Sequence, residues 1–202
     1  FISHRVDIDM HSGFGIEAAM RNSRYKAFSN HINKNDWLLT AHHKNDQVET
    51  LFLNLFRGSG IDGLSGISAK RKFLNGTLAR PLLDFSKNEL RKYALFNKLT
   101  WIEDSSNKDN SMDRNYLRND IIPRLEKRWP SINKRLTKVT KLASEAKHRS
   151  EDLAKIDLKS VGSIDCYNLL AFKELSNNRQ RNLLRYSLAC LNLPQPSYKQ
   201  LF

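Results

Sequence analysis

Apolar and polar positions in the first third of the chain predict a regular order of strands and helices. Apolar residues alternate with polar ones toward the end of residues 1–10, which predicts a strand. Ile16–His31 has the spacing of a helix, and Trp37–Ala41 is an apolar run typical of a buried strand. A helical period returns over Asp46–Phe56 and ends before Gly58. This strand–helix–strand–helix order predicts an α/β fold with a parallel sheet.

Further along the chain the pattern predicts mainly helices. The capping box Ser86–Glu89 marks the start of one of them. Pro130 interrupts the chain, and apolar positions from Ile132 to Ile156 then recur with a helical period, which predicts a long amphipathic helix. The other expected elements are short strands at 78–80 and 99–102, a helix over 113–120, a short helix opened by Pro123 and a helix over 177–191.

These elements divide the chain into two expected domains. We place the boundary between Asn119 and Ser131, where Pro130 breaks the pattern and the sequence turns helical and basic. Residues 1–125 are expected to form the larger, α/β domain. Residues 131–202 are expected to form a smaller, mainly helical domain.

The net charge of the chain indicates which class of molecule it binds. Lysine and arginine number 34 against 21 aspartates and glutamates, a net charge of +13 that favours nucleic acid over an anionic membrane. The segment Arg114–Arg149 alone holds 11 basic and 3 acidic residues. One interpretation is a solvated helix face. The other is a face that contacts phosphates, on which Lys134, Lys138 and Lys141 lie along the outer side of the predicted long helix.

Cysteine content and apolar run length exclude other classes. Cys166 and Cys190 are too few for a disulfide framework, and no Cys/His cluster has the spacing of a zinc site. Their apolar surroundings predict reduced core residues of a cytoplasmic protein. No apolar run approaches the roughly 18 residues of a membrane span, so no membrane partner is expected.

The most informative polar residues follow the strand at 37–41. The strand's carboxyl end and the free N–H groups of the next helix converge there, which is where open α/β sheets place binding sites. Asp46 is either a first-turn carboxylate that stabilises the helix by about 1 kcal/mol or a functional group. Glu49, one turn later, either faces the same pocket or lies on the surface. His43 is a general base, a phosphate contact or a hydrogen-bonded histidine at the strand end.

Two pairs of arginines also allow two interpretations each. Arg21 and Arg24 lie at helical spacing from Glu17, so they form a weak surface ion pair or the rim of a groove that meets carboxylate or phosphate. Arg114 and Arg118 lie four residues apart on one helical face, as solvated charges or as contacts to an anion.

Several segments resemble, in order, the motifs of one enzyme family. Residues 43–50, HKNDQVET, with RGSG at 57–60, are similar to the H-x-D-D-Q-x-E-T…R-G-S-G element of tRNA(Ile)-lysidine synthetases, in the ATP-pyrophosphatase (PP-loop) superfamily. Further matches are G-I-E-x-x-x-R-x-x-R-Y at 15–25, R-P-L-L at 80–83, W-x-E-D-x-S-N at 101–107 and R-N-x-x-R at 114–118. The chain departs from the family pattern at Asn45, where many members have aspartate.

The sequence also has no S-G-G-x-D-S loop, which the superfamily uses to hold ATP phosphates. We therefore expect a fragment whose first strand and ATP clamp lie upstream of Phe1. By itself this fragment is expected to be inactive or nearly so.

The resemblance implies an adenine nucleotide α-hydrolase-like domain and a two-step reaction. ATP adenylates the C2 oxygen of the wobble cytidine in tRNA(Ile) with a CAU anticodon, and the ε-amine of L-lysine then displaces AMP to leave lysidine. It implies ATP and Mg²⁺ as cofactors and leaves the oligomeric state open, with a homodimer as one option. The implied roles are catalysis for Asp46 and His43, a Mg²⁺ contact for Asp46, substrate binding for Glu49, Arg21, Arg24 and Arg57, and tRNA binding for Arg114, Arg118, Lys134, Lys138 and Lys141.

Two alternatives stay open. One is another PP-loop enzyme that modifies tRNA, although tRNA thiolation enzymes often need cysteines that this chain lacks. The other is a non-catalytic module that binds tRNA without ATP or lysine.

Overall fold

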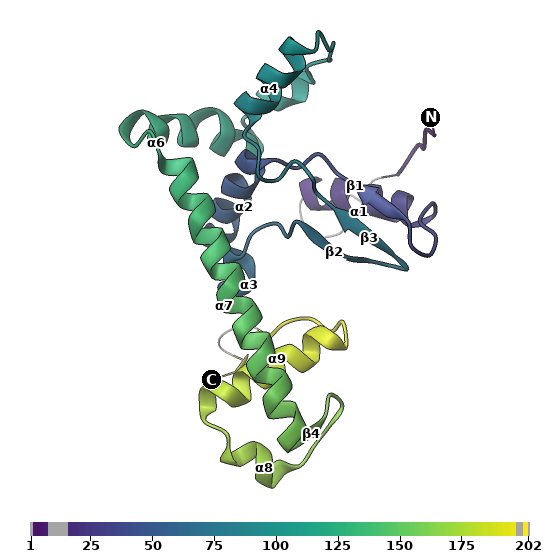
Figure 1. The fold of residues 1–202 in the computed structure, drawn as a ribbon, viewed down its shortest axis with the longest axis vertical. Helices are drawn as coiled ribbons and strands as arrows, with labels where there is room; N and C mark the ends of the chain where they lie inside the picture. Colours follow the sequence, from purple (N-terminus) through teal and green to yellow (C-terminus); the bar gives the residue numbers. More distant parts are fainter. Residues whose placement is uncertain (1, 8–15, 197–199, 202) are drawn as a thin grey trace.

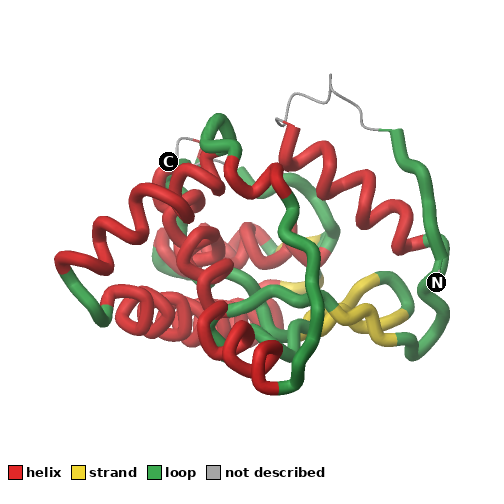
Figure 2. Tube along the Cα trace, turned by 90° about the horizontal axis from the view of Figure 1, so that it is seen from above, coloured by secondary structure: helices red, strands yellow, loops and turns green. Residues whose placement is uncertain are grey.

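The computed structural model of the protein describes residues 2–7, 16–196 and 200–201, and its main sheet is small and mixed. The strand order is β1 (Trp37–Leu39), β3 (Gly76–Ala79), β2 (Lys70–Phe73). β1 and β3 run parallel, as the α/β pattern predicts, whereas β2 and β3 form an antiparallel hairpin. Helix α1 (Ile16–Ser29) covers one face of this sheet (Figures 1 and 2), where the rings of Tyr25 and Phe73 meet edge-on.

The helix that follows β1 lies at the centre of the first core. This helix, α2 (Lys44–Phe56), and the short α3 (Ile61–Leu64) both pack against α7 (Ile132–Val161). On the inner face of α2, Val48 is fully buried with Leu117 and Ile122. The predicted helical period over 46–56 is confirmed, and the helix begins two residues earlier because His43 is its N-cap.

Residues 113–128 form one continuous helical run instead of two separate helices. It consists of α5 (Asp113–Tyr116), a π-helical turn η2 (Leu117–Ile121) and α6 (Ile122–Arg128). Pro123 therefore does not open a new helix. It lies in the first turn of α6, directly after the wider π turn, where proline's missing N–H removes no bond that the α-helical ladder needs.

The long predicted helix is confirmed and extends further than the pattern indicated. At 30 residues, α7 is about 45 Å long. Its beginning packs against α2 and α3, and its end packs against α8 (Leu169–Glu174) and α9 (Asn177–Cys190). Because α7 contributes to both groups of helices, the domain boundary at 119–131 stays a prediction.

A second core and a buried ion pair hold the end of the chain together. Ala154, Val161 and Leu183 are buried there, beside a small hairpin of β4 (Gly162–Ser163) and β5 (Cys166–Tyr167). Asp157 on α7 is fully buried and is bonded by the guanidinium of Arg179 on α9. The pair neutralises a carboxylate that would be costly to bury alone.

Two expectations from the pattern are wrong, and a third fails in the part of it that the structure describes. Residues 2–7 have no regular secondary structure, and residues 8–10 lie outside the described part. The strand expected at 99–102 does not form, because this exposed segment has no neighbouring strand to pair with. Cys166 and Cys190 are free but exposed, since one lies on the outer hairpin and the other ends α9.

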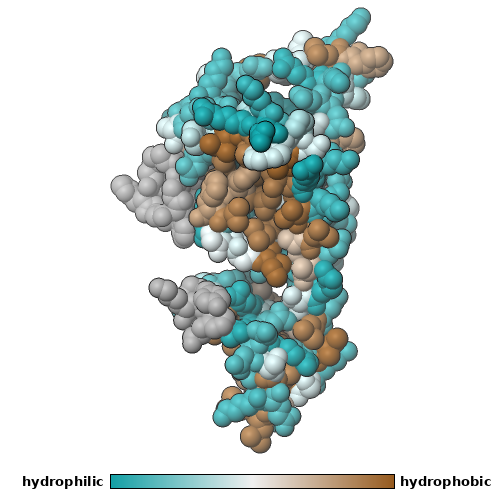
Figure 3. All heavy atoms as spheres, turned by 90° about the vertical axis from the view of Figure 1, so that its left-hand side faces the viewer, coloured by the Kyte–Doolittle hydropathy of each residue, from teal (hydrophilic) through white to brown (hydrophobic). Residues whose placement is uncertain are grey.

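Between the sheet and the π turn, the chain leaves the body of the molecule and returns. Helix α4 (Lys87–Phe96) begins at the predicted capping box, with Ser86 and Glu89 each bonding the other's backbone N–H. A 3₁₀ turn, η1 (Ser105–Lys108), follows. In Figure 1, α4 projects at the top of the molecule, and Figure 3 shows apolar side chains at that projecting end. No helix in the described part of the chain is long and apolar enough to cross a membrane.

Candidate active site

The N-terminus of α2 is shaped by the residues that join it to β1. His43 has an extended backbone, and its N–H donates to Asp46 Oδ2 over 2.8 Å, which closes the first turn. The N–H of Lys44 donates to the Phe85 carbonyl over 2.8 Å, so the start of α2 is attached to the segment before α4. Asp46 and Glu49, one turn apart, are both buried. Of the two interpretations of Glu49, the surface position is wrong, and a role in binding a ligand stays a prediction.

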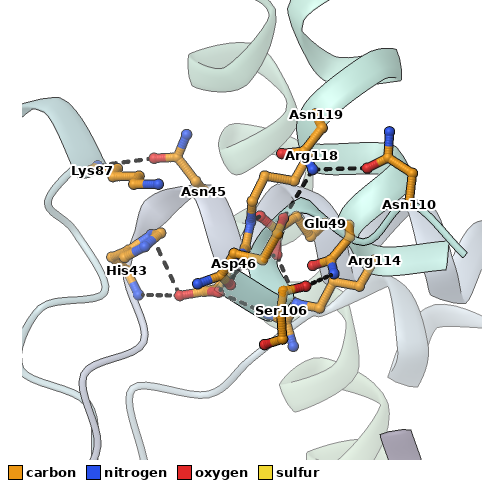
Figure 4. A network of polar contacts seen from close by, with 12 residues as sticks. His43, Asn45, Asp46, Glu49, Lys87, Ser106, Asn110, Arg114, Arg118 and Asn119 are labelled. Carbon is orange, nitrogen blue, oxygen red and sulfur yellow. Dashed lines mark hydrogen bonds and ion pairs between the residues drawn. The ribbon is translucent and has the colours of Figure 1, made fainter. Parts of the chain in front are cut away.

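Four charged side chains meet at this turn (Figure 4). Arg114 bridges the two carboxylates, with Nε 2.7 Å from Glu49 Oε2 and Nη2 2.8 Å from Asp46 Oδ1. Arg118 donates to both oxygens of Glu49, over 2.7 and 2.9 Å. Glu49 has no exposed surface, and charge-assisted bonds from two guanidinium groups offset the cost of burying it. The same bonds raise the pKa of Arg118 above its ordinary value.

Asparagine side chains surround this charge cluster and fasten the neighbouring loop. Asn115 is buried and donates to the carbonyls of Ser106 and Asp109. Arg118 donates to the side chain of Asn107 over 3.2 Å. On the other side, Asn45 accepts from the Lys87 N–H over 3.0 Å (Figure 4). A carboxylate oxygen could accept the same bond, so Asn45 keeps the hydrogen bond and omits a charge.

A cavity of about 400 Å³ opens beside Asp46. It lies between α1 and the end of β1 and is lined by Arg24, Tyr25, Phe28, residues 39–42 and Asp46. His42 Nδ1 lies 2.9 Å from the hydroxyl of Thr40. The pKa of His42 is lowered from 6.5 to about 4, mainly by burial; Asp46 opposes the shift, and the cations Arg80, Arg114 and Arg21 add to it. The imidazole is therefore neutral at pH 7.

The structure brings most of the predicted catalytic and substrate-binding residues together. Asp46 and Arg24 line the cavity, and Glu49 lies directly behind Asp46. His43 Nδ1 is 3.4 Å from Asp46 Oδ2. Arg21 is exposed, one turn from Tyr25, with its guanidinium over that ring. The sequence analysis missed His42, although its position directly after an apolar strand was the available signal.

Other predicted residues lie elsewhere. Arg57 is at the opposite end of α2, about 16 Å along the helix from Asp46, where it lines a separate cavity of about 460 Å³. Lys134 and Lys138 are exposed on α7, and Lys141 is paired with Asp84 at 3.0 Å. Arg114 and Arg118, predicted to bind tRNA, are engaged by Glu49 and Asp46. The roles of all these residues in binding stay predictions.

The side chains at this site decide whether a metal cation can bind there. No group of three or more histidine, cysteine, aspartate or glutamate side chains is arranged to hold a metal within the described residues. Mg²⁺ in nucleotide sites is held by one or two carboxylates together with phosphates and water. Asp46 fits that arrangement, because each of its oxygens accepts one bond here and a carboxylate oxygen has two lone pairs.

Comparison with known proteins agrees with this geometry. The family model for the PP-loop domain matches residues 1–125, more than half of the chain. This chain belongs to the PP-loop domain family. In its PP-loop domain lie the cavity, Asp46, Glu49, Arg114 and Arg118. A second model, the TilS substrate binding domain, matches residues 168–202, which include α8 and α9.

Similar curated proteins share one name. A tRNA(Ile)-lysidine synthase of Coxiella burnetii is 39% identical over 201 residues, which are 100% of this chain and 45% of that protein. Enzymes of the same name from Haemophilus ducreyi and Haemophilus influenzae are 41% and 39% identical, over 99% of this chain and 47% and 46% of theirs. The chain thus spans a little under half the length of each of these relatives.

Proposed function

We propose that this chain is part of a tRNA(Ile)-lysidine synthase, which uses ATP to join L-lysine to C2 of the wobble cytidine in tRNA(Ile) with a CAU anticodon. The observation that supports it best is the pair of buried carboxylates, Asp46 and Glu49, held by two arginines beside a cavity at a helix N-terminus. The PP-loop domain implies ATP as the nucleotide, and similar curated proteins carry this enzyme's name.

The first step makes a leaving group on the base. The C2 oxygen of cytidine attacks the α-phosphate of ATP, an O–P bond forms, and pyrophosphate leaves. Negative charge grows on the phosphate oxygens, and Arg24, which lines the cavity, together with the positive end of the α2 helix dipole is suited to stabilise it. Mg²⁺, held by Asp46 and the phosphates, supplies further neutralisation of the triphosphate when bound.

The second step consumes lysine. Its ε-nitrogen bonds to C2, the C2–O bond breaks, AMP departs, and the nitrogen loses a proton. Asp46 is the carboxylate that lines the cavity and would attract the lysine ammonium group, while Glu49 lies buried behind it, paired with Arg114 and Arg118. We propose that His43, which lies against Asp46, accepts the proton that the lysine nitrogen loses. His42 is poorly suited to take a proton near neutral pH, because its pKa is lowered to about 4.

The tRNA partner is assigned to the basic part of the molecule. Lys134, Lys138 and Lys141 lie on one stretch of α7 and are exposed to solvent. Such a row of cations binds RNA mainly through phosphates, with an affinity that falls steeply as salt rises. With tRNA as the substrate, we also propose a cytoplasmic enzyme.

The test uses the protein expressed from the whole open reading frame that encodes this chain. It is mixed with ATP, Mg²⁺, labelled lysine and tRNA(Ile) with a CAU anticodon, and elongator methionine tRNA serves as the control. We expect label only in the isoleucine tRNA and only with ATP. ATP-independent tRNA binding without label transfer would instead identify a non-catalytic module.

A pair of variants tests the site in the same assay. Asp46→Ala should abolish labelling while tRNA affinity changes little. The control Asp152→Ala removes an exposed carboxylate on α7 and should leave labelling intact. Labelling retained in Asp46→Ala removes Asp46 from the site.

A further inference from the structure

Residues 85–102, here called the α4 projection, carry an unusual set of exposed apolar side chains. Phe96 is 87% exposed and Ile102 97% exposed. Large apolar residues are also exposed at Phe85, Tyr93, Leu95, Leu99 and Trp101. Among the described helices and strands, none packs against α4 beyond isolated contacts. Figures 1 and 3 show this segment standing clear of the body with apolar atoms at its tip. Large apolar side chains gathered in one exposed segment mark a candidate binding surface.

Both ends of the α4 projection are fastened to the candidate active site. At its start, the Phe85 carbonyl accepts from the Lys44 N–H, and the Lys87 N–H donates to Asn45, the neighbour of Asp46. Just after its end, the 3₁₀ turn η1 is held by Arg118 and Asn115. Figure 4 shows Lys87 and Asn45 to one side of Asp46, and Ser106 and Arg118 to the other. The base of the α4 projection therefore lies beside the candidate active site.

The chemistry of the α4 projection fits unpaired RNA bases. Tyr93 and Phe96 lie three residues apart and so share one helical face, and Trp101 follows them. Lysine and arginine are interleaved with these rings, at Lys87, Arg91, Lys92 and Lys98. In the part of the chain that the structure describes, none of these four cations is paired with a carboxylate. Aromatic faces that stack bases, beside cations that meet phosphates, are the elements of single-strand binding.

This composition argues against a protein partner. Protein interfaces are depleted in lysine and in charge at their centre, whereas three lysines and an arginine are distributed through this apolar segment. The acidic Glu89 is occupied by Ser86 and lies 4.0 Å from Lys44, so it adds little negative charge to the surface.

We infer that the α4 projection stacks against unpaired bases of the RNA loop, beside the base held in the Asp46–Glu49 site. The inference rests on the proposed function for the identity of the RNA, an anticodon loop. Stacking on the neighbours of the reactive base holds the loop open and keeps that base out of its own stack. The projection thereby restricts the enzyme to loops and excludes duplex RNA.

The experiment measures binding of the whole-reading-frame protein to the anticodon stem-loop of tRNA(Ile), without ATP or lysine. Phe96→Ala and Trp101→Ala should each weaken Kd by about 5- to 100-fold, the range for loss of one base–aromatic stack, with an unchanged salt slope. Phe96→Trp should restore affinity. The matched control is Phe56→Ala, because Phe56 is 67% exposed at the far end of α2. Its Kd should stay at the wild-type value.

Two further readouts separate the outcomes. A 2-aminopurine next to the wobble base should be quenched by the wild type and less by Phe96→Ala, and a fully paired RNA hairpin should not distinguish the two proteins. Equal Kd values for Phe96→Ala and Phe56→Ala overturn the inference. So does sedimentation showing that Phe96→Ala converts a dimer to a monomer with RNA affinity intact, since the face then belongs to a second copy. Lysine transfer is scored separately, so stacking without transfer rejects the proposed function alone.

Discussion

At the scale of single residues, the site depends on one buried carboxylate. Sequence spacing predicted that Glu49 and Asp46 share a face, because residues one helical turn apart do so. It could not predict that Arg114 and Arg118, 65 and 69 residues further on, neutralise Glu49. Their spacing in the sequence predicts that the two arginines lie on the same face of a helix. Which carboxylate they contact is decided by the packing of α5 and η2 against α2.

Replacing Glu49 tests this cluster directly. Glu49→Gln keeps the shape of the side chain but leaves two buried guanidinium groups short of charge. The free energy of unfolding, measured by urea denaturation, should fall by about 3 kcal/mol. Glu174→Gln, at an exposed position on α8, should change it by less than about 0.5 kcal/mol. Equal values for the two variants would show that the cluster does not stabilise the fold.

The buried imidazole of His42 makes stability depend on pH. Its pKa is about 4 in the folded protein and about 6.5 in the unfolded chain. Between these values the unfolded state binds more protons, so stability is present above pH 6.5 and is lost as pH falls toward 4. Because the ring is only partly buried, we expect a loss on the order of 1–2 kcal/mol.

The measurement compares wild type with His42→Asn in urea titrations from pH 7 to pH 4.5. The stability difference between the two proteins should shrink as pH falls, because the variant has no imidazole to protonate. His148→Asn, at an exposed position on α7, is the control and should follow wild type. A difference that stays constant with pH would contradict the lowered pKa.

At the scale of elements, the sequence predicted correctly those elements that are stabilised by interactions between residues close together in the chain. The capping box at Ser86–Glu89 is one example, since both of its hydrogen bonds lie within four residues. The strand expected at 99–102 is the opposite case. Its apolar residues fit a strand pattern, but strand formation needs a partner edge, and the described sheet ends elsewhere. Its exposed apolar residues belong instead to the α4 projection.

Because α4 contacts little of the rest of the protein, loss of its N-cap should destabilise α4 alone. Ser86→Ala removes a hydrogen bond to the Glu89 N–H, worth about 1 kcal/mol. Because α4 packs on little else, amide exchange in α4 should quicken about fivefold while the global unfolding midpoint stays unchanged. Ser131→Ala, at the start of α7, is the control, since Ser131 makes no side-chain cap bond. A shifted global midpoint in Ser86→Ala would show that α4 unfolds together with the core.

At the scale of the whole molecule, α7 combines two properties, an apolar face and a basic face. The apolar face of α7 joins both cores, from Leu136 beside Val48 to Ala154 and Val161 beside Leu183. Its polar face carries the basic row. A helical period predicts the two faces, but a single sequence does not tell which neighbours each end of a long helix will meet. That is why the pattern predicted the helix correctly, while the domain boundary that it placed between Asn119 and Ser131 stays a prediction.

The position of the basic row along α7 gives the last prediction. Lys134→Glu/Lys138→Glu reverses two exposed charges near the start of the helix, on the part that packs beside α2. If both contact phosphates, tRNA binding should weaken and the slope of log K against log salt should flatten by about two.

The control variant, Lys155→Glu/Lys159→Glu, makes the same charge change on the same helix, in the part that packs beside α9. Both variants lower the net charge equally, so any long-range attraction to RNA falls equally in both. A larger loss of slope in the first pair therefore reports local phosphate contacts, and equal losses would place the RNA away from the start of α7.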